Sequence, residues 1–110
     1  MSDVADVLER AAKLIEPEGA WIKGWFAKDD RGRDLEPGDP HAVCWCARGA
    51  ILQAEPQAEQ LGVYEPLCTV LGVIDLYRIE EWNDVPGRTQ AEVVAKLREA
   101  AKLARENADA

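Results

Sequence analysis

The sequence has few of the residues and motifs on which most catalytic sites depend. Among its 110 residues are one histidine and three cysteines. The phosphate-binding, dinucleotide-binding, zinc-protease and serine-hydrolase patterns GxxxxGK[ST], GxGxxG, HExxH and GxSxG do not occur. An odd number of cysteines, two of them separated by one residue, is a poor disulfide framework and favours a reducing compartment. The sequence therefore predicts no cofactor and favours a protein that is not an enzyme.

Long apolar runs and a basic leader are also lacking. No apolar stretch approaches the roughly 20 residues that a membrane helix needs. The N-terminus shows neither the basic region nor the apolar core of a secretory signal. The net charge of −8 repels phosphate backbones and anionic lipids. We expect a cytoplasmic protein that binds neither nucleic acid directly nor membranes.

The sequence does contain enough apolar residues for one core. Hydrophobic residues make up 47% of the chain and include four tryptophans, each able to bury a large area. A chain of this length fits one domain, here residues 1–110. The predicted fold class is α+β and predominantly α-helical, with about four helices and a short β-hairpin near residues 20–36.

The first and last helices carry clear start signals. Residues 3–16 place apolar side chains at helical spacing, and Ser2 or Asp3 can cap the free backbone amides. Thr89 and Glu92 form a capping box, in which each side chain bonds the other residue's backbone amide. We predict that the last helix begins there.

The predicted hairpin lies between these helices. Residues 20–28 are rich in tryptophan and other strand formers, and residues 29–33 give a turn signal. A second short strand is expected near Leu35. Strand alternation would place Trp21 and Trp25 on the same face.

Two more helices are predicted in the middle of the chain. One runs over residues 43–54, where Gly49 suggests close packing against another element. The other covers residues 65–79, with Pro66 in its first turn. Residues 80–88 are predicted to be a loop.

The cysteines and the histidine are the first candidates for chemistry. A thiolate and an imidazole could ligate zinc or form a nucleophile–base pair. Cys-x-Cys is a poor zinc spacing, however, and buried free cysteines usually behave as small hydrophobic residues. We therefore expect no metal, and the weak candidate ligands are His41, Cys44, Cys46 and Cys68.

A second candidate is the segment before the last helix. In a recognition loop, Trp82 would anchor a partner, and Asp84 and Arg88 would make polar contacts. The alternative is a helix entry whose Trp82 fills the core. Together with Trp25, which could lie on an exposed apolar face, these residues are the predicted partner-binding site.

The acidic residues are a third candidate. The set is spread along the chain and consists of Glu16, Glu18, Glu36, Asp39, Glu80, Glu81 and Asp84. Residues 65–87 have a net charge of −4. A scattered set of this kind is usually solvated. It could also imitate the charge of nucleic acid and compete for a basic partner.

Two motifs carry a resemblance to a known family. They are the segment Cys46-Ala47-Arg48-Gly49-Ala50 and the run from Trp82 through Gly87-Arg88-Thr89 to Val93. On these residues the chain resembles DUF6197, an actinobacterial and phage-associated family of small proteins of unknown function. The resemblance implies a shared fold and a mobile-element setting, and it implies no catalytic residue.

These observations favour a non-enzymatic protein-binding or accessory module. Its partner would be another protein or a second copy in a homodimer. One alternative is a phage-type inhibitor of a host nucleic-acid-handling or defence enzyme, acting by acidic charge mimicry. The other is a cysteine- or metal-dependent enzyme.

Overall fold

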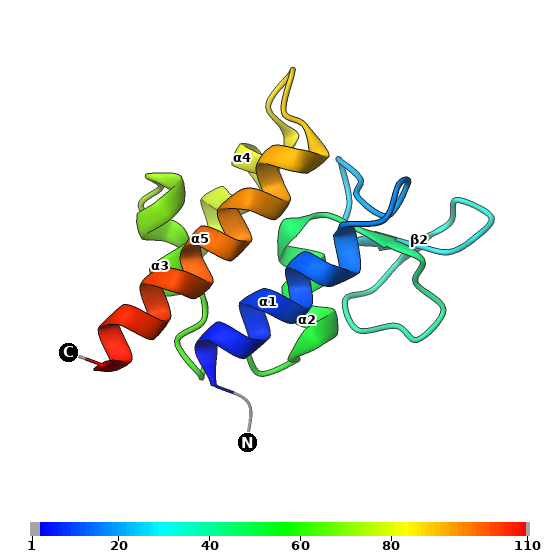
Figure 1. Cartoon of the computed structure of the whole chain (residues 1–110). Coiled ribbons are helices and arrows are strands. Elements are labelled where there is room, and N and C mark those ends of the chain that lie inside the picture. The colour runs from blue at the N-terminus through cyan, green and yellow to red at the C-terminus, as the bar shows by residue number, and fades with distance from the viewer. Residues whose placement is uncertain (1–2, 110) are drawn as a thin grey trace.

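Two antiparallel helices, α1 (Val4–Ile15) and α5 (Gln90–Asp109), lie side by side at the centre of the fold (Figure 1). They are seen in a computed structural model that describes residues 3–109. Asp3 caps α1 by accepting a 2.8 Å bond from the Asp6 amide, as predicted. Ser2, the other predicted cap, lies outside the described residues.

The predicted capping box opens α5. The Thr89 amide donates to Glu92, and the Glu92 amide donates to the Thr89 hydroxyl. One residue later, Gln90 donates from its side chain to the carbonyl of Ile15, at 2.6 Å. Gln90 therefore joins the start of α5 to the end of α1.

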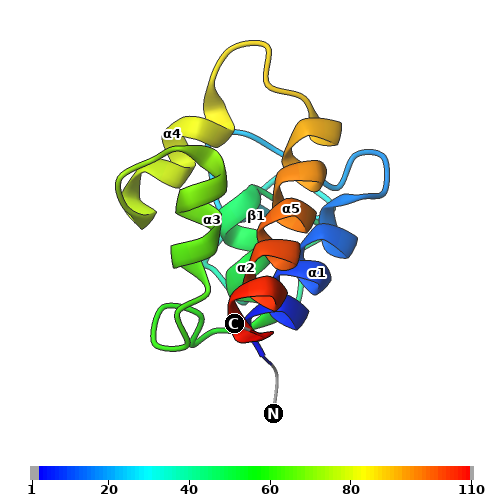
Figure 2. The ribbon, with the colours of Figure 1, turned by 60° about the vertical axis from the view of Figure 1, so that its left-hand side comes forward.

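Three further helices complete the core. The helix α2 (Ala47–Ala54) packs against α1, and α3 (Tyr64–Leu71) packs on the side of α5 away from α1 (Figure 2). The short α4 (Ile79–Asp84), preceded by a 3-10 turn η1 (Leu76–Arg78), contacts α2 and α3. The largest fully buried apolar side chains come from all five helices and the segment before α3: Val7, Leu8, Ile15, Ile51, Val63, Leu67, Ile79, Val93 and Leu97.

A small antiparallel sheet lies at one end of the helices. Its strands are β1 (Ala27–Lys28), β2 (Asp34–Leu35) and β3 (Cys44–Trp45), in the order β2-β1-β3. The β1–β2 pair is the predicted hairpin. The fold is thus α+β and mostly helical, as expected, with five α-helices in the described part of the chain rather than about four.

The predicted strand over residues 20–28 is wrong for most of its length. Only Ala27–Lys28 is a strand, and residues 20–26 form a loop that we call the tryptophan loop. Gly24 has a φ of +89°, which breaks the alternation on which the prediction depended. Trp21 and Trp25 therefore do not share a strand face.

The predicted start of the second helix is also wrong. Cys44–Trp45 is a strand because its backbone pairs with β1, so α2 begins at Ala47. Cys46 is the N-cap, and its sulfur accepts a bond from the Gly49 amide at 3.3 Å.

The predicted helix over residues 65–79 is two elements. The first, α3, ends at Leu71 because Gly72 adopts a left-handed conformation with a φ of 73°, and the second is η1. The predicted loop over 80–88 is wrong in its first half, where α4 extends to Asp84. This additional helix explains the underestimate of the helix count.

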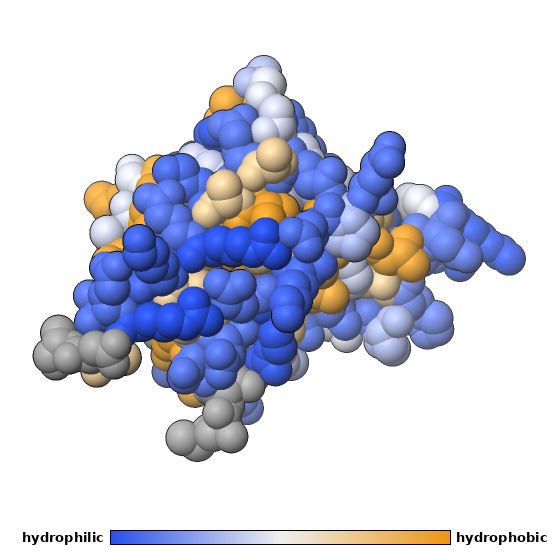
Figure 3. All heavy atoms as spheres, viewed as in Figure 1, coloured by the Kyte–Doolittle hydropathy of each residue, from blue (hydrophilic) through white to orange (hydrophobic). Residues whose placement is uncertain are grey.

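The face formed by α1 and α5 is mainly hydrophilic (Figure 3). Ion pairs cross between the two helices, including Arg98–Glu16 at 2.8 Å and Arg105–Glu9 at 3.4 Å. Within residues 3–109, no helix has the length and apolar character needed to cross a membrane.

Candidate binding surface

A buried asparagine joins three distant parts of the chain. The side-chain oxygen of Asn83, which is fully buried, accepts bonds from the Trp21 indole at 2.7 Å and the Ala47 amide at 3.0 Å. Its side-chain nitrogen donates to the carbonyl of Ile22 at 3.1 Å and to Asp84 at 3.0 Å. We call this arrangement the Asn83 junction. It connects the tryptophan loop, the first turn of α2 and the end of α4.

Helical spacing explains why Asn83 is buried. It follows Ile79 by four residues, so both side chains lie on the same face of α4, and both are fully buried. A buried amide group is stable only when its donors and acceptors are bonded, and the junction supplies partners for both atoms.

Asp84 extends the junction to the surface. Its carboxylate accepts a bond from the Gly24 amide at 3.1 Å. Nearby, the Lys23 ammonium donates to the carbonyl of Val85 at 3.0 Å. The tryptophan loop is thus held against the end of α4 by three successive residues, Ile22, Lys23 and Gly24.

Beside the junction, an arginine is surrounded by aromatic rings. The Arg48 guanidinium lies 5.7 Å from the ring centres of Phe26, Tyr64 and Tyr77. It also forms a 3.2 Å ion pair with Glu80. Cation–π attraction and the ion pair hold the Arg48 side chain among these rings.

Three large apolar side chains next to residues of this aromatic group are unusually exposed. Ile74 is 87% exposed, Tyr77 66% and Trp25 39%. The Trp25 and Phe26 rings meet edge to face at 5.7 Å. We use the name aromatic–acidic surface for the following residues: Trp25, Phe26, Arg48, Ile74, Asp75, Tyr77, Glu80 and Asp84.

A cavity of about 210 Å³ opens within this surface. Trp25 and Phe26 are its aromatic lining residues, and Glu80 and Asp84 are its acidic ones. Cys46 and Gly24 complete the lining. The tryptophan loop, the start of α2 and α4 therefore all contribute to one small hollow.

The four predicted partner-binding residues fall into two groups. Trp25 and Asp84 line this cavity together. Trp82 and Arg88 form a separate pair, with the guanidinium 3.9 Å from the centre of the indole ring and its Nε donating to the Trp82 carbonyl. Trp82 also packs against the core, which is the place that the helix-entry alternative assigns to it.

The structure does not bring the weak metal candidates together. His41 is exposed and bonds Asp39 at 2.9 Å, Cys44 is buried in β3, and Cys68 lies in α3. Across residues 3–109, no three histidine, cysteine or acidic side chains are grouped as metal ligands would be.

Cys46 is poorly suited to act as a nucleophile. Burial is the main cause that raises the pKa of its thiol to about 11, with smaller contributions from the carboxylates of Glu80 and Asp84, against the lowering effect of the Gly49 and Arg48 amides. A thiol with this pKa is almost entirely protonated at neutral pH.

We expect the Cys46 thiol to make stability fall at high pH. The native pKa lies above that of an exposed thiol, so the unfolded state loses its proton first as the pH rises. The effect is absent below about pH 8.5 and grows to roughly 2–3 kcal/mol by pH 11. Urea unfolding of the wild type and Cys46→Ser between pH 7 and 11 would measure it, since serine keeps the cap without this titration. Parallel pH curves for the two proteins would contradict the expectation.

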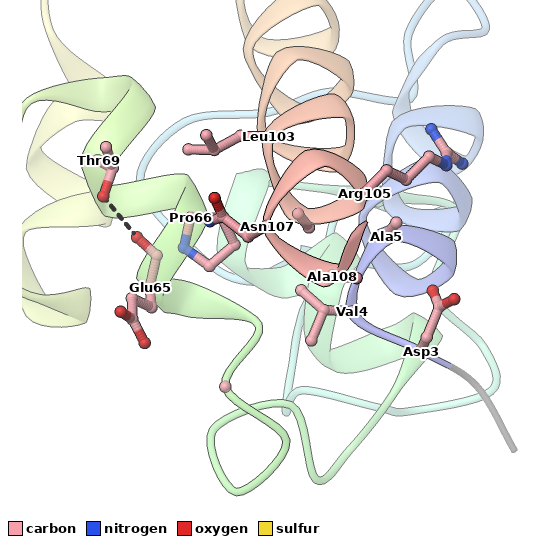
Figure 4. A pocket seen from close by; sticks show the side chains of 12 residues that line it. Asp3, Val4, Ala5, Glu65, Pro66, Thr69, Leu103, Arg105, Asn107 and Ala108 are labelled. Atoms are coloured by element: carbon pink, nitrogen blue, oxygen red, sulfur yellow. Dashed lines mark hydrogen bonds between the residues drawn. The ribbon is translucent and has the colours of Figure 1, made fainter. Parts of the chain in front are cut away.

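A wider hollow of about 930 Å³ lies between the start of α1, α3 and the end of α5 (Figure 4). Its apolar lining includes Val4, Pro66 and Leu103. Two of its polar side chains already form hydrogen bonds with helix backbone. Asp3 caps α1, and the Thr69 hydroxyl donates to a carbonyl of its own helix. Among the described residues, the lining contains no combination of side chains that specifies a ligand.

Several residues of the aromatic–acidic surface were not predicted from the sequence. Arg48 lies within the motif that carries the family resemblance, but its three aromatic neighbours come from separate segments. Tyr77 and Glu80 fell inside a predicted helix and a predicted loop. The spacing of Ile79, Trp82 and Asn83 is the one signal that could have revealed α4.

The comparisons with known proteins bear on the family. The family model DUF6197, described as a family of unknown function, matches residues 1–103. No curated protein and no solved structure matches the chain. The match includes both motifs on which the resemblance was based and all residues of the aromatic–acidic surface. The chain therefore belongs to DUF6197, a family of unknown function.

Proposed function

We propose that the protein is a non-enzymatic binding module that holds a basic segment of another protein on the aromatic–acidic surface. The observation that carries the proposal is the exposure of three apolar side chains close to one another. Tyr77 lies beside Arg48, and Trp25 packs on Phe26, another neighbour of Arg48. Ile74 lines a shallow hollow together with Tyr64, the third ring beside Arg48. Exposed aromatic side chains grouped in this way are typical of interfaces and costly to leave in water.

The charge around these side chains favours a basic partner. The surface contains three acidic residues, Asp75, Glu80 and Asp84, and one arginine, Arg48. A second copy bound through the same surface would bring two acidic patches together, because a twofold interface pairs a patch with itself. Like charges facing each other oppose association. A different, basic protein is therefore favoured over a homodimer.

The arrangement also supports binding without a large change in shape. The tryptophan loop is fixed to α4 by the Asn83 junction, so Trp25 is already in position before a partner arrives. A preformed surface loses less conformational entropy on binding.

Charge mimicry of nucleic acid is less well supported. Two of the carboxylates on α4 are paired with arginines, Glu80 with Arg48 and Glu81 with Arg78. The surface also combines its charges with exposed apolar groups, which a phosphate backbone lacks. An enzyme that uses Cys46 is disfavoured by the protonated state of its thiol.

Selection from a random peptide library on the purified protein would test the proposal. We expect enriched peptides to contain lysine or arginine beside aliphatic or aromatic residues. Because the Tyr77 ring is largely exposed, Tyr77→Ser should weaken their binding by at least about tenfold while leaving the fold intact. Leu61→Ser is the matched control, since Leu61 is an exposed apolar residue outside the surface. Failure to enrich any peptide, or equal binding by both variants, would contradict the proposal.

A further inference from the structure

We infer that the cavity lined by Trp25, Phe26, Glu80 and Asp84 binds the guanidinium group of an arginine side chain from the partner. This inference rests on the proposed function and specifies what its central contact would be. The cavity holds about 210 Å³, which suits one side chain rather than a folded element.

The lining selects for a flat cation. Indole and phenyl rings attract cations to their faces, and carboxylates accept strong charge-assisted hydrogen bonds. A planar guanidinium can stack on a ring and direct two N–H groups at two acceptor oxygens in its own plane, which an ammonium cannot do. Trp25 and Phe26 supply the rings, and Glu80 and Asp84 supply the carboxylates.

Each carboxylate has one oxygen that the hydrogen bonds of the described residues leave unused. Within the described residues, one oxygen of Asp84 accepts from Gly24 and Asn83, and one oxygen of Glu80 accepts from Arg48. Their second oxygens receive no hydrogen bond from the described part of the chain. The bonds to the first oxygens restrict the motion of both side chains before a ligand binds.

The protein itself uses the same contact twice nearby. Arg48 lies among three rings while paired with Glu80. Arg88 stacks on Trp82 at 3.9 Å while paired with Glu92. Both combine a guanidinium, an aromatic ring and a carboxylate. In the cavity, Trp25 and Asp84 add a ring and a carboxylate that no arginine of the described residues contacts.

Titration with a small probe, followed by two-dimensional ¹H–¹⁵N NMR, would test the inference on the full chain. The probe is N-acetyl-arginine methylamide, and its neutral counterpart is the citrulline analogue, which has nearly the same shape. We expect saturable shifts of the Gly24 amide and the Trp25 indole signals with the arginine probe. Binding of the citrulline analogue should be weaker by at least about tenfold, because it has no charge.

Matched variants locate the site. Glu80→Gln and Asp84→Asn each remove one charge from the cavity while keeping an oxygen that can accept the existing bonds. Either should weaken probe binding by about fivefold or more. Glu81→Gln removes a charge from the same helix outside the cavity and should leave binding unchanged. Thermal melts check that each variant is folded.

The outcomes separate this inference from the proposed function. Equal binding of the two probes, or no saturable shift at Gly24 and Trp25, overturns the cavity assignment even if selected peptides bind the surface. Tighter binding of the corresponding lysine probe overturns the choice of guanidinium. A saturating arginine probe together with a failed peptide selection supports the cavity and contradicts the protein-binding function.

Discussion

Asn83→Ala is expected to lower the free energy of unfolding by about 3–5 kcal/mol. The substitution removes four hydrogen bonds made by a fully buried side chain. Leaving a buried donor or acceptor without a partner costs about 1–3 kcal/mol, and the Ala47 amide is deeply enclosed. Trp21 and Asp84 lie nearer the surface, where water can replace part of the loss. Urea unfolding followed by tryptophan fluorescence would measure the change.

The matched control for this substitution is Asn107→Ala. Asn107 is an exposed asparagine on α5, so its replacement should change stability by no more than about 0.5 kcal/mol. A loss below about 1 kcal/mol for Asn83→Ala would mean that the junction does not hold the tryptophan loop.

Asn83→Asp tests whether stability depends on the hydrogen bonds that the side-chain nitrogen of Asn83 donates. The new carboxyl keeps the acceptor for Trp21 and Ala47 but directs an oxygen at the carbonyl of Ile22 and at Asp84. Burial and the adjacent charge would raise its native pKa above that of the unfolded chain. The deficit relative to the wild type should therefore be small near pH 4 and grow as the pH rises through the native pKa.

Local signals in the sequence predicted the elements that depend on near neighbours. The Asp3 cap and the box of Thr89 and Glu92 were identified correctly because both partners lie within three residues of each other. Gly49 was correctly expected to mark close packing, although the sequence could not identify its neighbour as Phe26.

Elements decided by distant partners were predicted wrongly. Cys44–Trp45 has the apolar character of a buried helix, and its strand conformation follows from pairing with β1. The Asn83 segment resembles a turn because asparagine and aspartate often form turns. The side chain of Asn83 instead accepts a hydrogen bond from the indole of Trp21, which is 62 residues away. Periodicity within one segment contains no information about such a partner.

The candidate surface was predicted only in part for the same reason. Trp25 and Asp84 were named because of their residue types, and the fold places them around one cavity. The contribution of Glu80 depends on α4 being a helix, and that of Arg48 depends on rings from three other segments. These contacts between distant residues form only in the folded chain.

Gly49→Ala is the second substitution with a large expected effect. A Cβ at this position would overlap the Phe26 carbonyl oxygen and lie 2.7 Å from the carbonyl carbon. The same oxygen accepts the Cys46 amide at 3.1 Å, so the backbone cannot withdraw without breaking that bond. Alanine favours a helix by about 1 kcal/mol, which only partly offsets the overlap. We expect a net loss of about 2–3 kcal/mol in urea unfolding.

Gly72→Ala is the control for Gly49→Ala. It replaces a glycine with alanine where the new Cβ would not overlap another atom. Gly72 has a φ of 73°, and a Cβ there would meet no atom within 4 Å. Its replacement should cost about 1–2 kcal/mol from backbone conformation alone. The two variants should also differ at the binding surface, because only Gly49→Ala displaces Phe26 from the wall of the arginine cavity. If Gly49→Ala were as stable as the wild type, α2 and the tryptophan loop could not be in contact as observed, and the cavity between them would not be preformed.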